Sequence, residues 1–153
     1  MGLSAKLSNG RLDRPLSPAT PSGRLVQRII DQSPGLPAGR TNLVKCPPLG
    51  PTGKTRPPTA EEINSCLPQL ALEVEALVPR LVILLGAAVA GSMERHLGVG
   101  LPRWDGFRYG SVRSGGVSYA AVQHPSYIRV YKRKLEDEYV AGVTGLIQNL
   151  AAG

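Results

Sequence analysis

The stretch LVILLG, Leu81–Gly86, decides the fold class of this 153-residue chain. It is short, wholly apolar and β-branched at Val82 and Ile83, and it ends at a glycine. An apolar run without polar alternation is typical of a strand that is covered on both faces. Such strands belong to parallel sheets that lie between two layers of helices.

Extended and helical patterns alternate on both sides of this strand. TNLVKC (41–46) and VSYAAVQ (117–123) predict two further strands, and WDGFRYGSVRSGG before the second predicts a loop or a small hairpin. Strands that alternate with helices predict an α/β protein, here a three-layer α/β/α sandwich with a short, mostly parallel central sheet. The length favours a single domain over residues 1–153.

Four segments carry helical patterns. Ser22 is the expected N-cap of a helix over 23–32, and the capping box of Thr59 and Glu62 starts a helix that should run to Leu77. The other two helices are predicted after Gly86 and over about 132–150. Residues 1–21 are predicted to be loop-rich, and residues 47–58 form a Pro/Gly loop.

The charge balance favours a polyanionic partner. Eighteen Lys and Arg residues against 11 Asp and Glu residues give a net charge of +7. Lysine and arginine bind nucleic acids by neutralising phosphates. The longest apolar run, 81–91, is about half the length of a membrane span, and the start of the chain does not resemble a leader. We therefore expect a cytoplasmic, DNA-associated monomer without a membrane partner.

Three other features have simpler explanations. GPTGKT (50–55) lacks the first glycine of a phosphate loop, because Pro48 occupies that place, so an NTPase is rejected. His96 is expected near a helix end before Gly98. Cys46 and Cys66 cannot complete a tetrahedral metal site without further ligands, and buried, unreactive thiols are the default.

Two polar residues stand at predicted strand ends. His124 follows the strand over 117–123, and Asn42 lies at the start of an otherwise apolar strand. Ligands of parallel sheets bind at the carboxyl edge of the strands, which makes both residues candidates for a site. The alternatives are a turn or capping asparagine and a histidine that bonds a neighbouring backbone carbonyl.

The order of four segments resembles one known family. TNLVKCPP, RPPTAEEINSCLPQL, LVPRLVILLGAAV and VQHPS, within residues 41–126, are similar to motifs of the uracil-DNA glycosylase superfamily. They are most similar to its iron–sulfur branch, families 4 and 5. The resemblance implies an α/β fold and a protein that binds DNA and hydrolyses the N-glycosidic bond of a flipped uracil or related modified pyrimidine. The alternatives are a catalytically impaired homologue that binds DNA or a base, and an unrelated basic α/β domain.

The start of the chain resembles the family's next motifs, with differences. Gly2–Lys6 is similar to the first active-site loop, so the family's first strand is predicted to be missing. Leu3 and Ser4 stand where the family has a carboxylate or an asparagine, and Leu16 stands where an aromatic ring stacks on uracil. Gly2, Leu3 and Leu16 are thereby expected to bind the substrate or the DNA, with Leu16 at the stacking position.

The resemblance also bears on cofactors. Cys46 and Cys66 match two of the four iron–sulfur ligands, and the N-terminal cysteine pair has no counterpart. No cofactor is therefore expected, and an iron–sulfur cluster (4Fe–4S) would form only if the missing ligands came from elsewhere.

Each candidate residue has an expected role in that reaction. His124 would stabilise the departing base at its O2 atom, and Asn42 would bond the polar edge of uracil and reject cytosine. Ser4 is the expected but poor water activator, with Asp13 as a more distant candidate.

The segment after His124 is expected to hold DNA. Pro125 and Ser126 would grip a phosphate, and Tyr127 or Ile128 would fill the space that the flipped base leaves. Further phosphate contacts are expected from one helix start and from four basic side chains: Ser22, Gly23, Arg129, Lys132, Arg133 and Lys134.

Overall fold

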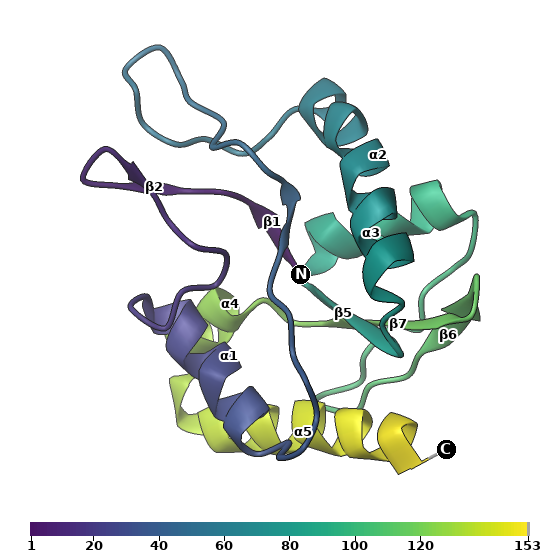
Figure 1. The fold of residues 1–153 in the computed structure, drawn as a ribbon. Helices are drawn as coiled ribbons and strands as arrows, with labels where there is room; N and C mark the ends of the chain where they lie inside the picture. Colours follow the sequence, from purple (N-terminus) through teal and green to yellow (C-terminus); the bar gives the residue numbers. More distant parts are fainter. Residues whose placement is uncertain (153) are drawn as a thin grey trace.

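A computed structural model describes residues 1–152 as a mixed α/β protein (Figure 1). The strands are β1 (Gly2–Ser4), β2 (Leu7–Ser8), β3 (Arg11–Leu12), β4 (Asn42–Val44), β5 (Leu81–Leu85), β6 (Val112–Ser114) and β7 (Val117–Val122). The helices are α1 (Pro21–Asp31), α2 (Ala60–Leu77), α3 (Ala87–Leu97), α4 (Pro125–Tyr131), the 3₁₀ turn η1 (Arg133–Leu135) and α5 (Glu136–Ala152). None of the helices described is long and apolar enough to cross a membrane.

The central strands run parallel except at one edge. β5 pairs with β7 in parallel from Leu81 to Leu85, and β6 adds to β7 in the antiparallel direction. β1 and β4 form a second parallel pair. Met1 joins the two groups, because its nitrogen donates to the Ile83 carbonyl (2.6 Å) and its carbonyl accepts from Leu85 N–H (3.0 Å). The spatial order is therefore β4-β1-β5-β7-β6, and the predicted mostly parallel sheet is confirmed.

Helices cover both faces of this sheet. Side chains alternate along the strands: Leu85 and Ala120 pack in the cluster formed with α1, α4 and α5, whereas Leu84 and Ala121 pack in the cluster formed with α2 and α3. Figure 1 shows these two groups of helices on opposite sides of the strands. A period of two with both faces apolar explains why LVILLG contains no polar residue. The predicted three-layer sandwich is confirmed.

The prediction that the first strand is missing is wrong. β1 lies at the centre of the sheet, between β4 and β5, although it contains only three residues. The prediction of an irregular segment over 1–21 is also only partly right, because this segment holds β1 and the β2–β3 hairpin. Gly10, with a positive φ of 74°, closes the hairpin turn, a conformation that glycine adopts without steric cost.

Two predicted helix starts differ from the structure. Thr20, not Ser22, caps α1, since its hydroxyl accepts from the Gly23 amide (3.0 Å). The last helical region is longer than predicted and begins as α4 directly after His124, followed by η1 and α5. The helix over 60–77 is confirmed, and Thr59 and Glu62 form both hydrogen bonds of the capping box.

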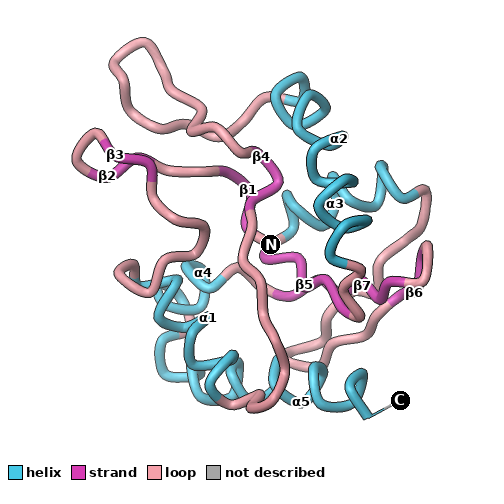
Figure 2. Tube along the Cα trace, in the orientation of Figure 1, coloured by secondary structure: helices cyan, strands magenta, loops and turns pink. Residues whose placement is uncertain are grey.

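Two irregular segments project together from one side of the sheet. Figure 2 shows that the chain after β1 and the loop between β4 and α2 extend in the same direction. The 47–58 loop is anchored to α2, because Arg56 donates to both carboxylate oxygens of Glu62 (2.8 and 2.7 Å).

Gly23 brings the 14–17 loop against the start of α1. A Cβ atom at this position would lie 1.8 Å from the Ser17 carbonyl oxygen, a backbone atom that cannot rotate away. Gly145, in the middle of α5, has no atom within 4 Å of the corresponding point.

These two helical glycines predict opposite effects on stability. Gly23→Ala should lower the free energy of unfolding by about 1–3 kcal/mol, because the loop must move. Gly145→Ala should raise it by about 0.5–1 kcal/mol, because alanine favours the helix and meets no neighbour. Urea denaturation measures both, and equal effects in the two variants would contradict the close contact at Gly23.

Candidate functional site

The strand register brings Asn42 to the level of His124. Leu85 pairs with Val122 at the carboxyl ends of β5 and β7, and Leu85 N–H bonds the Met1 carbonyl. These two bonds of Met1 flank Leu84, so Gly2 and its register partner Asn42 are level with Leu85 and Val122, the last pair of β5 and β7. His124 follows β7 by two residues. Both candidates therefore lie at the carboxyl edge of the sheet.

Asn42 presents a buried amide group without a protein partner. The residue is only 6% exposed, and no other group among residues 1–152 hydrogen-bonds its side chain. Its Oδ1 atom lies over Gly2, where a Cβ atom would come within 2.5 Å of it. Neither amide atom is among the fully buried polar atoms without a partner in residues 1–152, so the amide reaches solvent and can meet an incoming group. An amide held in this way is suited to bind a polar ligand.

A charged network fixes the backbone on either side of Asn42. Lys45 Nζ donates to the Asn42 carbonyl (2.7 Å), the Thr41 hydroxyl (2.7 Å) and the Glu73 carboxylate (2.6 Å). The Thr41 hydroxyl also donates to Glu73 (2.9 Å), which joins β4 to α2. These contacts position Asn42 without using its side chain.

His124 is the N-cap of α4. Its Nδ1 atom accepts from the Ser126 backbone N–H (3.1 Å) and lies 2.7 Å from the Ser126 hydroxyl. A backbone N–H can only donate, so Nδ1 carries no proton and the neutral ring holds its proton on Nε2. The histidine thus offers a hydrogen-bond donor at Nε2. The alternative, in which the ring bonds a neighbouring backbone carbonyl, is wrong, because Nδ1 accepts from the Ser126 N–H.

The surroundings of His124 favour the neutral ring. Burial lowers the pKa of this histidine below its usual value of 6.5, and the positive charge of Lys6 acts in the same direction. Gly86 lies against the ring, since a Cβ atom there would be 3.1 Å from the His124 Cβ.

Gln123 holds the chain immediately before the histidine. Its side chain accepts from the Tyr109 hydroxyl (2.5 Å) and donates to the Gly106 carbonyl (2.7 Å), and its backbone carbonyl accepts from the Tyr139 hydroxyl (2.9 Å). Burial raises the pKa of both tyrosines, which remain donors at neutral pH. Neither tyrosine is a candidate from the sequence, because the partners of both hydroxyls are distant in the chain.

Strand alternation separates the predicted contacts of the substrate or the DNA. Gly2 and Asn42 are register partners and share one face, and Leu16 Cδ2 would lie 3.5 Å from a Cβ atom at Gly2. Leu16 adopts a positive φ of 50°, and Arg40 donates to its carbonyl (2.9 Å). Leu3 points to the opposite face and packs with the α2–α3 cluster, so the structure does not bring it together with Gly2 and Asn42 as a substrate contact.

Neither of the two expected water activators is a strong base that is free to act at the site. Ser4 shares the face of Gly2 by alternation and is half-buried. Asp13 follows the β2–β3 hairpin and accepts from the Ser8 hydroxyl (2.7 Å), which ties the carboxylate to that hairpin.

The α4 segment offers some of the predicted DNA contacts. Tyr127 is 44% exposed, and its ring centroid lies 5.3 Å from that of Tyr131. Ile128 is completely buried, so its predicted insertion into DNA is wrong. Pro125 is also buried, and Arg129 pairs with Glu136 (3.3 Å). The remaining basic side chains are exposed: Lys132, Arg133 and Lys134.

The predicted phosphate contact at Ser22 and Gly23 competes with a hydrogen bond inside the protein. The Gly23 amide already donates to the Thr20 hydroxyl, so it is not free to bind a phosphate. The Ser22 side chain is half-buried.

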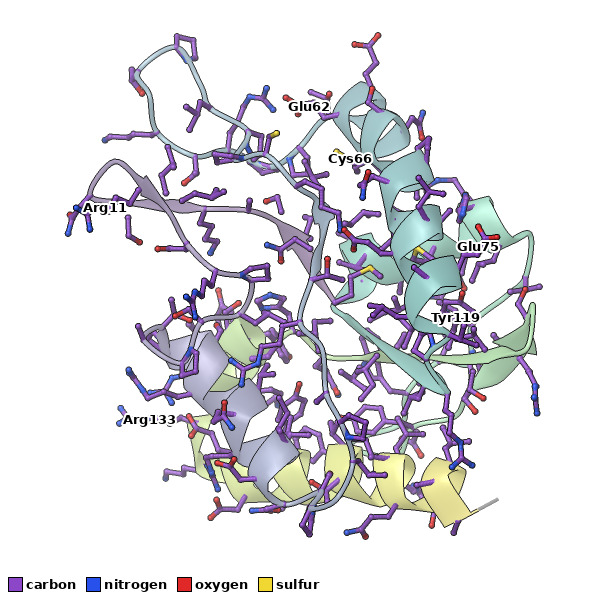
Figure 3. All side chains as sticks on the ribbon, in the orientation of Figure 1. Arg11, Glu62, Cys66, Glu75, Tyr119 and Arg133 are labelled. Atoms are coloured by element: carbon purple, nitrogen blue, oxygen red, sulfur yellow. The ribbon has the colours of Figure 1, made fainter. Side chains whose placement is uncertain are left out.

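The residues present do not fit an iron–sulfur cluster. Cys46 is an exposed free thiol, and Cys66, on α2, is a half-buried one (Figure 3). Within residues 1–152, no three His, Cys, Asp or Glu side chains converge in a way that could hold a metal ion. A cluster bound by four thiolates therefore has no ligand set in the described part of the chain.

Comparison with known protein families gives a match. A family model described as the uracil DNA glycosylase superfamily matches residues 12–145, which include Leu16, Asn42 and His124. No curated protein matches the chain.

The network around Asn42 predicts an effect of Glu73 on stability. Glu73→Gln should lower the free energy of unfolding by about 1 kcal/mol, because Lys45 loses its charged partner in a partly buried place. Glu75→Gln, two residues along α2 on an exposed side chain, should change it by less than about 0.5 kcal/mol. Thermal denaturation compares the two, and an equal effect would show that the network is not stabilising.

The environment of His124 predicts its titration. His96→Gln leaves His124 as the one imidazole of the chain, so NMR can follow it alone. Its pKa should lie below 6.5 with the proton on Nε2. Because the unfolded state then binds the proton more readily, stability should fall as the pH drops through 6.5 toward the folded-state pKa. A pKa above 6.5, or a proton on Nδ1 in the neutral form, would contradict the geometry.

Proposed function

The chain belongs to the uracil DNA glycosylase superfamily, and from this premise we propose that it binds DNA and hydrolyses the N-glycosidic bond of a flipped uracil or related modified pyrimidine. The observation that carries the proposal is one pair of side chains. Among residues 1–152, no group hydrogen-bonds the Asn42 amide or the His124 Nε2–H, and both residues lie at the same edge of the sheet.

The amide suits the edge of uracil. An asparagine presents one donor and one acceptor, and uracil presents the O4 acceptor and the N3–H donor on its pairing edge. Cytosine reverses both groups, so it would leave the buried amide unpaired. Sites built around such hydrogen bonds reject the mismatched ligand strongly. The network of Lys45 and Glu73 keeps the amide in place before the base arrives.

The histidine suits the leaving group. Bond cleavage gives the sugar oxocarbenium character and leaves negative charge on the base, which concentrates at O2. A neutral imidazole that donates from Nε2 stabilises this anion by a preorganised hydrogen bond. The lowered pKa of His124 keeps the ring neutral at physiological pH, and Lys6 adds a positive charge nearby.

Exposed groups around the site suit a DNA strand. Tyr127 stands on α4 next to the histidine and is exposed enough to enter the space of the flipped base. Lys132, Arg133 and Lys134 follow in the same segment and can neutralise phosphates. Water would enter beside Ser4, which needs a stronger base than its hydroxyl for fast hydrolysis.

The test is cleavage of oligonucleotides that contain one uracil, single- or double-stranded, followed by alkali to break the resulting abasic sites. His124→Asn should lower the rate by about 10²–10³-fold, because the side chain can still cap α4 but lacks the imidazole donor. A variant that keeps the full rate would remove His124 from the mechanism.

Asn42→Leu separates function from stability. The rate on uracil should fall by at least about 10²-fold. The free energy of unfolding should change by less than about 1 kcal/mol, since leucine has nearly the same shape and the amide side chain holds no other residue in place. No strand scission by the wild-type protein on any pyrimidine lesion, together with salt-sensitive DNA binding, would favour the catalytically impaired homologue.

A further inference from the structure

A cleft of about 480 Å³ opens beside His124, between the start of α3 and the α4–η1 segment. Its walls include Gly86, His124, Tyr127, Lys132, Trp104 and Phe107. Of the described residues that line it, none is Asn42 or Leu16, so it is distinct from the place proposed for the flipped base. Its size lies within the range of sites that hold small organic groups.

The aromatic walls are held by the core. Trp104 is half-buried and packs against the cluster of α2 and α3. Phe107 lies edge-on to the buried Tyr139, with 6.0 Å between ring centroids and 75° between planes. Rings that are fixed on one side and open on the other provide a platform on which a nucleobase can stack at low entropic cost.

The charge of the cleft fits a DNA strand. Lys132 lines it, and the described lining residues contain no Asp or Glu. Asp105, next to Trp104 in the chain, pairs with Arg108 (2.7 Å), and the exposed Arg133 and Lys134 follow Lys132.

A second hollow, of about 400 Å³, has the opposite character. Glu75, His96 and Tyr119 contribute to it, with no Lys or Arg among its described lining residues. Figure 3 shows Glu75 and Tyr119 on the other side of the molecule from Arg133. The combination of aromatic rings with a basic rim therefore belongs to the cleft beside His124.

We propose that this cleft binds the nucleotide next to the flipped one, with its base stacked on Trp104 and its phosphate near Lys132. The inference rests on the proposed function for the position of the flipped nucleotide, because His124 forms a wall of the cleft. It adds a subsite for an unpaired neighbouring base, which implies that a single strand binds better than a duplex. In a duplex, that base is stacked and paired within the helix.

Trp104 is the one tryptophan of the chain, so its fluorescence reports the cleft directly. Three single-stranded oligonucleotides serve as probes, each with a central uncleavable abasic site that mimics the flipped position. The first has thymine on both sides, and the other two lack the base on the 5′ or the 3′ side. The first should quench Trp104, and removal of one particular neighbouring base should abolish most of the quenching.

Affinities of the same probes test the stacking. The wild-type protein should bind the first probe on the order of tenfold more tightly than the probe that lacks the stacked neighbour. Trp104→Leu should bind both equally, whereas Trp104→Phe, which keeps a ring, should retain most of the preference. Lys132→Gln should weaken binding of every probe and reduce the salt dependence by about one phosphate contact. Thermal denaturation checks that each variant is folded.

Two results would overturn the inference: equal binding of all three probes by the wild-type protein, or an unchanged preference in Trp104→Leu. The outcome is independent of the glycosylase assay, because no probe is cleaved. Base-dependent quenching without uracil release would leave the subsite standing and refute the proposed activity. Uracil release with equal binding of the probes would support the proposed activity and refute the subsite.

Discussion

The parallel pairing of β1 between β4 and β5 is the constraint on which the site depends. Only three residues form β1, and Met1 connects it to β5 by two backbone hydrogen bonds. This ladder fixes the level of Asn42 relative to the ends of β5 and β7. A shift of the register by one residue would turn Asn42 to the α2–α3 face and bring Leu43 to the site.

Buried polar groups at this edge are arranged in two different ways. The backbone of Asn42 is bound through Lys45, Thr41 and Glu73, while its side-chain amide is left without a partner. Gln123 is held at both its side chain and its carbonyl, so that His124 begins α4 in one orientation. Rigid supports around an unpaired amide and a free N–H donor are what preorganised binding requires, because little entropy is lost when the ligand arrives.

Much of the layer structure could be predicted from the sequence. The apolar stretch of Leu81–Leu85, the capping box of Thr59 and the strand before His124 appear in the structure where their patterns place them. The predictions failed where partners are distant or the pattern is short. β1 contains too few residues to show a period. Thr20 and Ser22 are both residue types that cap helices, so the sequence does not tell which of them caps α1. The prediction that Ile128 could fill the space of the flipped base fails, because α4 turns this side chain into the core.

The sequence by itself determined the alternation of strands and helices and named Asn42 and His124 as candidates, because local periodicity and strand ends are properties of short segments. Only the tertiary structure decided that Gly2, Leu16 and Asn42 share one place while Leu3 faces the other layer. It also decided the proton position on His124, through the Ser126 amide, and the cleft beside Trp104, which joins α3, α4 and the 98–111 loop. These features depend on contacts between backbone atoms and side chains of distant segments. Hydrogen bonding and burial are set by such contacts in space, and local sequence patterns do not contain them.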